Sequence, residues 1–194
     1  ARRRATIAAC ERSLKRLRTD RIDLYLLHWR EDTPLEETLE AFTALARAGK
    51  IRYWGVSNFD LDDMRELVGL AGGGQVAANQ VMYNLKRRGI EYELLEWCRR
   101  RRIPIIAYSP LDQGALAGSR RLKRIGARLG ATAAQVALAW NLRRKGVVSI
   151  PRATKQSHVR ENRAALGLRL GQEDLAELDR AFPAPRRKRQ LETV

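Results

Sequence analysis

Short hydrophobic runs alternate along the chain with segments of helical periodicity. The runs are rich in β-branched and aromatic residues, which favour strands, and their starts lie 30, 24, 27 and 44 residues apart. The pattern predicts strands at residues 22–29, 52–57, 76–83, 103–109 and 147–151. These runs are nearly continuous in apolar residues, which is typical of parallel strands covered on both faces.

Capping residues place helices between the predicted strands. Thr33-Pro34-Leu35-Glu36 has the form of a capping box with proline at the first helical position, and Gly49 is expected to end that helix. Asp60 is expected to cap the helix that follows. The remaining predicted helices cover residues 6–18, 61–70 and 91–102, the segment between the capping pair Thr132/Gln135 and Gly146, a segment that begins at Ser157, and residues 172–182.

Strand–helix repeats of this length indicate an α/β fold in which helical crossovers join parallel strands. A doubly wound open sheet and a TIM-type (β/α)8 barrel both fit. The open sheet should carry GxGxxG after its first strand, whereas Gly72-Gly73-Gly74 precedes a strand. A barrel has eight strands in about 250 residues. The five strands therefore predict an incomplete barrel over residues 1–182, followed by a basic tail at 183–194.

Composition excludes several classes of protein. Hydrophobic residues make up 44% of the chain, which excludes a disordered tail, and the apolar runs are far shorter than the roughly 20 residues of a membrane span. Cys10 and Cys98 are too few for a disulfide framework or a metal cluster. We expect two buried thiols in a reducing, cytoplasmic compartment and no bound metal.

The chain is strongly basic, with 38 Lys and Arg against 22 Asp and Glu and a net charge of +16. This charge raises the alternative of a nucleic-acid-binding protein. The sequence contains no zinc finger or RNP motif. We interpret the basic residues, including the run at 186–189, mainly as solvated surface.

Each predicted strand ends in polar or aromatic residues. Barrel enzymes build their sites at this end of the strands, so we expect these side chains to converge. The set provides an imidazole, amides, hydroxyls, a flat aromatic ring and a cation, which suits a flat polar ring and a phosphate. The strand ends are His28-Trp29, Ser57-Asn58, Tyr108-Ser109-Pro110-Leu111 and Pro151-Arg152, and the third strand carries Asn79-Gln80 and then Tyr83-Asn84.

These motifs, followed by Arg160-Glu161-Asn162, resemble those of the aldo-keto reductase family in order and spacing. The resemblance extends from Ala1 to the tail. It implies a (β/α)8 barrel that reduces small aldehydes and ketones with NADPH, with NADH as an alternative cofactor. Ala153 and His158 depart from the family pattern, in which Ser and Arg are common, and both departures remove contacts to a phosphate.

The resemblance also implies roles for individual residues. His28 is the catalytic residue that orients the substrate carbonyl, and Trp29 lines the substrate pocket. Tyr108 stacks on the nicotinamide ring. The remaining implied cofactor contacts are Ser57, Asn58 and Gln80 at the carboxamide, Ser109 and Leu111 near the pyrophosphate, Arg152, Thr154 and His158 at the 2′-phosphate, and Glu161 and Asn162 at the adenine.

Of the family's four catalytic residue types, Asp, Tyr, Lys and His, the resemblance places only His28 in this chain. Only five of a barrel's eight strands are predicted, and the chain starts at Ala1 rather than Met. We therefore expect about three strand–helix units to be supplied by an upstream segment or a second chain, or to be lacking in a truncated product. We expect the 194 residues to be inactive alone. A noncatalytic nicotinamide-nucleotide-binding module is the main alternative to a reductase.

Overall fold

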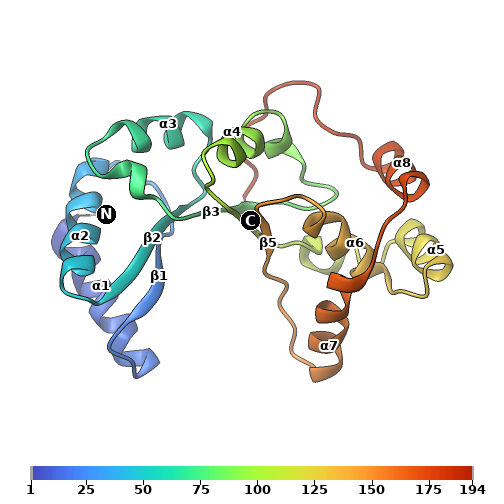
Figure 1. Ribbon diagram of the computed structural model, residues 1–194, viewed down its shortest axis with the longest axis horizontal. Coiled ribbons are helices and arrows are strands. Elements are labelled where there is room, and N and C mark those ends of the chain that lie inside the picture. Colours follow the sequence, from blue (N-terminus) through green and yellow to red (C-terminus); the bar gives the residue numbers. More distant parts are fainter. Residues whose placement is uncertain (1, 194) are drawn as a thin grey trace. The chain divides into compact units, whose positions relative to one another are not determined.

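The computed structural model describes residues 2–193 and divides the chain into two compact units, residues 1–80 and 81–194. Both units repeat strands and helices (Figure 1). The first contains α1 (Arg3–Leu17), β1 (Ile22–Leu27), α2 (Leu35–Arg47), β2 (Ile51–Ser57), α3 (Leu61–Gly69) and the 3₁₀ turn η1 (Gly73–Gln75). Strand β3 (Asn79–Met82) crosses the division between the units.

The second unit continues the alternation. Its helices are α4 (Leu94–Arg100), α5 (Arg120–Arg128), α6 (Ala133–Leu142), α7 (Gln156–Ala164) and α8 (Gln172–Ala181). Its strands are β4 (Ile105–Tyr108) and β5 (Val147–Ser149), and its 3₁₀ turns are η2 (Gly89–Glu91), η3 (Asp112–Gly114) and η4 (Ala165–Gly167).

Hydrogen-bonded neighbours in the sheet follow the order β1-β2-β3-β4-β5. The pairs β1–β2, β2–β3 and β4–β5 are parallel, with Leu27 opposite Val56 and Ser57 opposite Gln80. A doubly wound sheet reverses its strand order at a switch point, whereas this order is sequential, as it is in a barrel. The predicted parallel α/β fold is confirmed.

The core of the first unit forms where the apolar face of α2 meets the sheet. Leu35, Leu39, Phe42 and Leu45 repeat at helical spacing and are all buried. The Phe42 ring stacks on Trp54 of β2, with ring centroids 5.3 Å apart. Burial of four such side chains, each contributing about 1.5–3 kcal/mol, holds α2 on β1 and β2 and keeps the ends of these strands in place.

Glycine is required within β2 because another part of the backbone comes very close. A Cβ atom at Gly55 would lie 2.5 Å from the carbonyl oxygen of Ala78. The main chain joins β2 to the segment just before β3 through Val56 N–H to Ala78 O and Ala77 N–H to Trp54 O. This close approach sets the spacing of the two strands that carry Ser57 and Gln80.

Several predicted helix ends are confirmed. Asp60 accepts hydrogen bonds from Asp62 N and Asp63 N in a capping box, and Thr132 forms a second capping box with Gln135. Gly49 ends α2 with φ of +70°, where Gly49 N donates to Ala46 O and Lys50 N to Leu45 O. This is the bonding pattern of a Schellman motif.

Other predicted ends are wrong. Pro34 is itself the N-cap of α2, so Thr33 lies one residue outside the helix and the predicted capping box does not form. Gly146 does not close α6, which ends at Leu142; it lies in the turn before β5, with φ of +85°. Helix α5, capped by Ser119, was not predicted because its short, arginine-rich segment buries only Leu122, Ile125 and Gly126.

Four of the five strands are shorter than the hydrophobic runs that predict them, whereas β2 begins one residue before its predicted run. The run at 22–29 yields a strand that ends at Leu27, which leaves His28 and Trp29 in the following loop. The run at 76–83 yields only Asn79–Met82, because Val76 closes the 3₁₀ turn η1 and the carbonyl of Tyr83 binds the side chain of Asn141. The run at 103–109 yields Ile105–Tyr108 and that at 147–151 yields Val147–Ser149.

Both thiols are buried, as predicted. Burial raises the pKa of Cys98 to about 12, and burial also raises the pKa of Cys10. Neither residue is therefore an activated nucleophile. Within residues 2–193, no group of three or more His, Cys, Asp or Glu side chains is placed to hold a metal ion.

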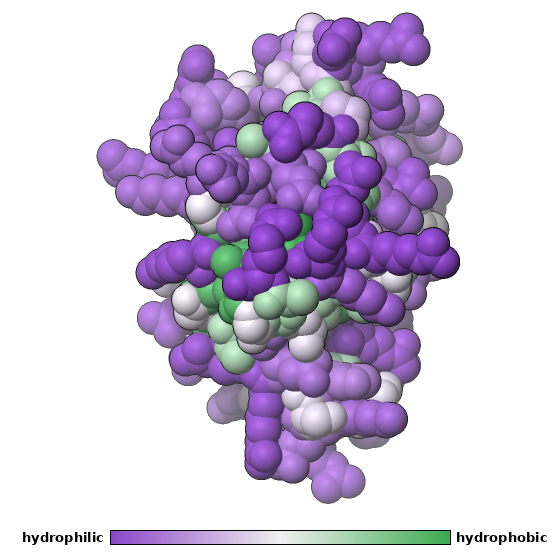
Figure 2. Space-filling model, turned by 90° about the vertical axis from the view of Figure 1, so that its right-hand side faces the viewer, coloured by the Kyte–Doolittle hydropathy of each residue, from purple (hydrophilic) through white to green (hydrophobic). Residues whose placement is uncertain are grey.

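Figure 2 shows one face of the molecule, where hydrophilic residues cover most of the surface and hydrophobic residues are exposed in a small area near the middle. Many arginines are paired with carboxylates, such as Arg99 with Glu96 and Arg124 with Glu177. No helix in the described part of the chain combines the length and apolar content that crossing a bilayer requires.

Candidate functional site

In the first unit, His28 and Trp29 lie in the loop that follows β1. Both side chains are exposed, and their ring centroids are 5.6 Å apart. They border a hollow of about 420 Å³ that is also lined by Tyr25 and by one side of α1. A carbonyl compound could enter this hollow and meet both an imidazole and an indole.

The loop after β2 is bonded directly to that segment. Asn58 adopts a left-handed conformation with φ of +60°, and its Nδ2 donates a hydrogen bond to the His28 carbonyl over 3.2 Å. Asn58 N donates to Gln80 O over 2.8 Å, and the buried Ser57 hydroxyl donates to the same oxygen over 3.0 Å. The structure thus brings together His28, Ser57, Asn58 and Gln80.

Tyr25 also borders this hollow. Burial is the main cause that raises its pKa above the usual value of a phenol. A raised pKa is the opposite of what a proton donor working near neutral pH requires. We therefore assign Tyr25 no role as a proton donor.

In the second unit, the loops after β4 and β5 enclose a hollow of about 630 Å³. Five residues assigned to the cofactor from sequence line it: Ser109, Leu111, Arg152, Thr154 and His158. Arg152 is exposed, and within residues 2–193 it makes no ion pair. An unpaired guanidinium beside a hydroxyl and an imidazole is suited to binding a phosphate.

Helix α7 begins at this hollow. Its N-cap, Lys155, makes no side-chain capping bond, and the first turn contains no acidic residue. The uncapped N–H groups and the positive end of the helix dipole favour an anion there. Together with Arg152, they give one side of the hollow a positive potential.

The loop after β4 holds a strained backbone. Ser109, Asp112 and Gln113 all have positive φ, between 48° and 55°. Each such residue costs of order 1–3 kcal/mol and persists only where its surroundings hold it. Asn84 Nδ2 donates to Ser109 O over 2.8 Å, and Asp112 pairs with Lys86 at 3.1 Å and with Arg87 at 3.6 Å.

Three assigned residues do not line this hollow. Tyr108 is the half-buried last residue of β4, and Glu161 and Asn162 are half-buried on α7. The Glu161 carbonyl accepts a hydrogen bond from Gln135 Nε2 over 3.2 Å. Their roles at the nicotinamide and adenine stay predictions.

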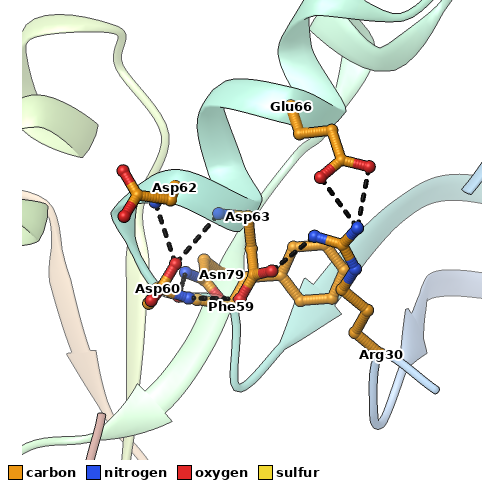
Figure 3. Close-up of polar contacts among 7 residues, drawn as sticks. All are labelled: Arg30, Phe59, Asp60, Asp62, Asp63, Glu66 and Asn79. Atoms are coloured by element: carbon orange, nitrogen blue, oxygen red, sulfur yellow. Dashed lines mark hydrogen bonds and ion pairs between the residues drawn. The ribbon is translucent and has the colours of Figure 1, made fainter. Parts of the chain in front are cut away.

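Sequence reasoning missed the charged residues that hold these loops. Arg30, in the loop after β1, binds Asp63 and Glu66 of α3, as Figure 3 shows. Asp112 holds the loop after β4 in the same manner. The only local signal for this contact was the three-residue spacing of Asp63 and Glu66, which places both carboxylates on one face of the helix.

Comparisons with known proteins agree with this geometry. The sequence pattern of the Aldo/keto reductase family matches residues 1–182. Methylglyoxal reductase YeaE of Escherichia coli is 49% identical over 193 residues, which are 97% of this chain and 68% of that protein. The NADH-specific methylglyoxal reductase of Escherichia coli is 35% identical over 196 residues, and the match covers 84% of this chain and 59% of that protein.

A solved structure shows the same fold. The crystal structure of an aldo-keto reductase from Klebsiella pneumoniae in complex with NADPH superposes with a TM-score of 0.94 at 49% identity, covering 96% of this chain and 67% of that one. The chain therefore belongs to the aldo/keto reductase family, as its motifs indicated. It spans about two thirds of the length of these relatives.

Proposed function

We propose that this chain forms the nucleotide-binding and carbonyl-orienting part of an NADPH-dependent reductase of small aldehydes and ketones. The observation that carries the proposal is the hollow between the loops after β4 and β5. Arg152, Thr154 and His158 line it beside the uncapped start of α7. This donor set fits a phosphorylated nucleotide.

In this proposal, the residues of the chain bind the nucleotide and orient the substrate. A bound nicotinamide nucleotide supplies the hydride. Arg152, Thr154 and His158 hold the phosphate, and Ser57, Asn58 and Gln80 provide hydroxyl and amide groups for the nicotinamide carboxamide. His28 donates a hydrogen bond to the oxygen of the substrate carbonyl, which polarises it, while Trp29 packs against the body of the substrate.

The substrate that we propose is a small dicarbonyl compound of the methylglyoxal type. Two relatives, at 49% and 35% identity, are named methylglyoxal reductases. The hollow beside His28 and Trp29, at about 420 Å³, is at the small end of the range of ligand pockets. One of these relatives is named NADH-specific, so NADH has to be tested beside NADPH.

We also propose that the 194 residues bind the nucleotide without efficient turnover. The family resemblance places His28 in this chain but none of the catalytic Asp, Tyr and Lys. The expected mechanism uses the Tyr as a proton donor, with its pKa lowered by the neighbouring Lys. Without that donor, the reduced oxygen is not protonated efficiently.

The test measures nucleotide binding and turnover separately. Fluorescence titration of the chain with NADPH is expected to saturate, and NADPH oxidation by methylglyoxal is expected to stay near the uncatalysed rate. A chimera, in which the part of Escherichia coli YeaE that this chain does not match precedes it, is expected to turn over. Absence of saturable binding would contradict the proposed function, and turnover by the chain alone would contradict the division of roles.

A second variant tests His28 in the chimera. His28→Ala is expected to lower turnover at least tenfold with NADPH affinity unchanged, because the imidazole contacts the carbonyl rather than the nucleotide. Equal losses in turnover and NADPH affinity would instead assign His28 a structural role.

A further inference from the structure

The guanidinium of Arg30 joins the loop after β1 to helix α3. Its Nη1 lies 2.5 Å from Asp63 Oδ1, and its Nη2 lies 2.7 Å from both carboxylate oxygens of Glu66. Figure 3 shows the guanidinium lying between the two acidic side chains. Arg30 follows His28 by two residues and Trp29 by one, so this contact is made at the end of the segment that carries the proposed carbonyl contacts.

One of the two carboxylates is itself held in place. Asp63 Oδ2 accepts a hydrogen bond from Asp60 N over 3.1 Å, while Asp63 N donates to Asp60 Oδ1 over 2.9 Å. These bonds form the capping box of α3. Arg30 therefore binds a side chain fixed to the start of a helix rather than a freely rotating surface carboxylate.

The other end of the segment is held by the loop after β2. Asn58 Nδ2 binds the carbonyl of His28, and the next residue, Phe59, accepts a hydrogen bond through its carbonyl from buried Asn79 Nδ2 over 2.8 Å. The segment from His28 to Arg30 is thus bonded at both ends to residues 58–66. Trp29 lies between the two bonds.

We propose that Arg30 is a positioning residue that fixes the Trp29 indole beside His28 before a carbonyl compound binds. Trp29 is 43% exposed, so its own burial does not hold it in one orientation. A planar guanidinium that binds two carboxylates fixes the adjacent backbone geometrically. The roles of Trp29 and His28 rest on the proposed function; the restraint on Trp29 does not.

The experiment reads the Trp29 environment directly. The chain is labelled with 5-fluorotryptophan, and the ¹⁹F resonance of Trp29 is assigned by its disappearance in Trp29→Phe. In Arg30→Met we expect this resonance to move toward its position in the urea-unfolded chain and to narrow. The buried Trp54, in the same unit, should keep its resonance.

Arg65→Met is the matched control. Arg65 lies on α3 and pairs with Asp62 at 3.3 Å, with both side chains about 60% exposed. The Arg65→Met substitution removes the same charge from the neighbourhood of α3 but leaves the contacts of Arg30 intact, so the Trp29 resonance should not move. Arg30 binds Asp63 and Glu66 through two different nitrogens. Arg30→Lys keeps the charge but offers a single nitrogen, so its Trp29 shift should lie between those of the wild type and Arg30→Met.

Glu66→Gln provides a variant that leaves both Arg30 and the capping box intact. It should shift Trp29 in the same direction, and adding Arg30→Met should then give less than the sum of the two shifts. An unchanged Trp29 resonance in Arg30→Met or in Glu66→Gln would overturn the proposal. NADPH titration of the same samples separates this result from the proposed function. If the wild-type chain does not bind NADPH, the proposed function is contradicted, but the Trp29 resonance still reports whether Arg30 restrains the indole.

Discussion

Asn58 donates a hydrogen bond from Nδ2 to the main-chain carbonyl of His28 over 3.2 Å while its own backbone is left-handed, with φ of +60°. Asparagine tolerates this conformation better than most residues. The contact bonds the end of β1 to the end of β2. Asn58 therefore has two roles: it adopts a left-handed conformation, and its side chain holds the main chain of His28, the proposed catalytic residue.

Substitution of Asn58 should separate these two properties. Asn58→Asp keeps the tolerance for positive φ but replaces the amide donor with an oxygen, so we expect the free energy of unfolding to fall by about 1–2 kcal/mol. Asn58→Gly loses the bond but relieves the backbone, and should cost less. Urea denaturation measures both values, and an Asn58→Asp variant as stable as the wild type would show that the bond contributes nothing.

Arg88 occupies a buried polar network in the second unit. Its side chain is 5% exposed, binds Glu91 at 2.8 Å and Asp179 at 2.7 Å, and stacks over the Trp140 ring at 5.0 Å. Removing Arg88 leaves the buried carboxylate of Glu91 with the Tyr83 hydroxyl and the more distant Arg144 as partners, and breaking a buried ion pair costs about 3–5 kcal/mol. We expect Arg88→Met to lose this much in urea denaturation.

Arg144→Met is the control for that network. Arg144 pairs with the same Glu91 at 3.5 Å, but its side chain is 44% exposed. Its removal should cost about 1 kcal/mol or less. Equal losses in the two variants would mean that burial does not set the strength of this network.

Glu177 on α8 should contribute to the acid sensitivity of the protein. Hydrogen bonds from Arg124 and then Arg128, at 2.8 and 2.9 Å, lower the pKa of its carboxyl. Because the folded-state pKa lies below the unfolded value, the stabilisation is present above the unfolded pKa and is lost as pH falls through the folded pKa. Glu177→Gln should therefore lose less stability on acidification than the wild type.

Unfolding curves collected from neutral pH down to about pH 3 measure this difference. Glu173→Gln, on the same helix and with no ion pair among residues 2–193, should retain the wild-type acid dependence. If the free energy of unfolding of Glu177→Gln fell with decreasing pH as steeply as that of the wild type, Glu177 would not contribute to the acid sensitivity.

Local sequence patterns predicted most of the fold because the physics of those features is local. Alternation of apolar runs with helical periodicity predicted five parallel strands, and Asp60 and Thr132 cap helices as expected. The short helix α5 was missed because it contains only two large apolar residues, Leu122 and Ile125, within an arginine-rich segment. Thr33 failed as a cap because the adjacent Pro34 takes the N-cap position.

The candidate site was only partly predictable. Candidate residues next to strand ends, such as His28, Asn58 and Arg152, could be selected from sequence because polar side chains that directly follow an apolar run are easy to recognise; their roles stay predictions. The residues that hold the loops could not. Arg30 and Asp63 are 33 positions apart in sequence, and a contact over that distance leaves no periodic or adjacent pattern to read.

A comparison of NADPH and NADH binding by Arg152→Ala tests the proposed phosphate site most directly. We expect NADPH affinity to fall about 10- to 100-fold, the effect of losing one charge-assisted contact of about 1.5–3 kcal/mol. NADH, which lacks the 2′-phosphate, should bind almost as it does to the wild type. Arg160→Ala, an exposed residue of α7 that does not line the hollow, should change neither affinity. Equal losses for both nucleotides, or no loss of NADPH affinity, would contradict the assignment of the hollow between the loops after β4 and β5 to the nucleotide phosphate.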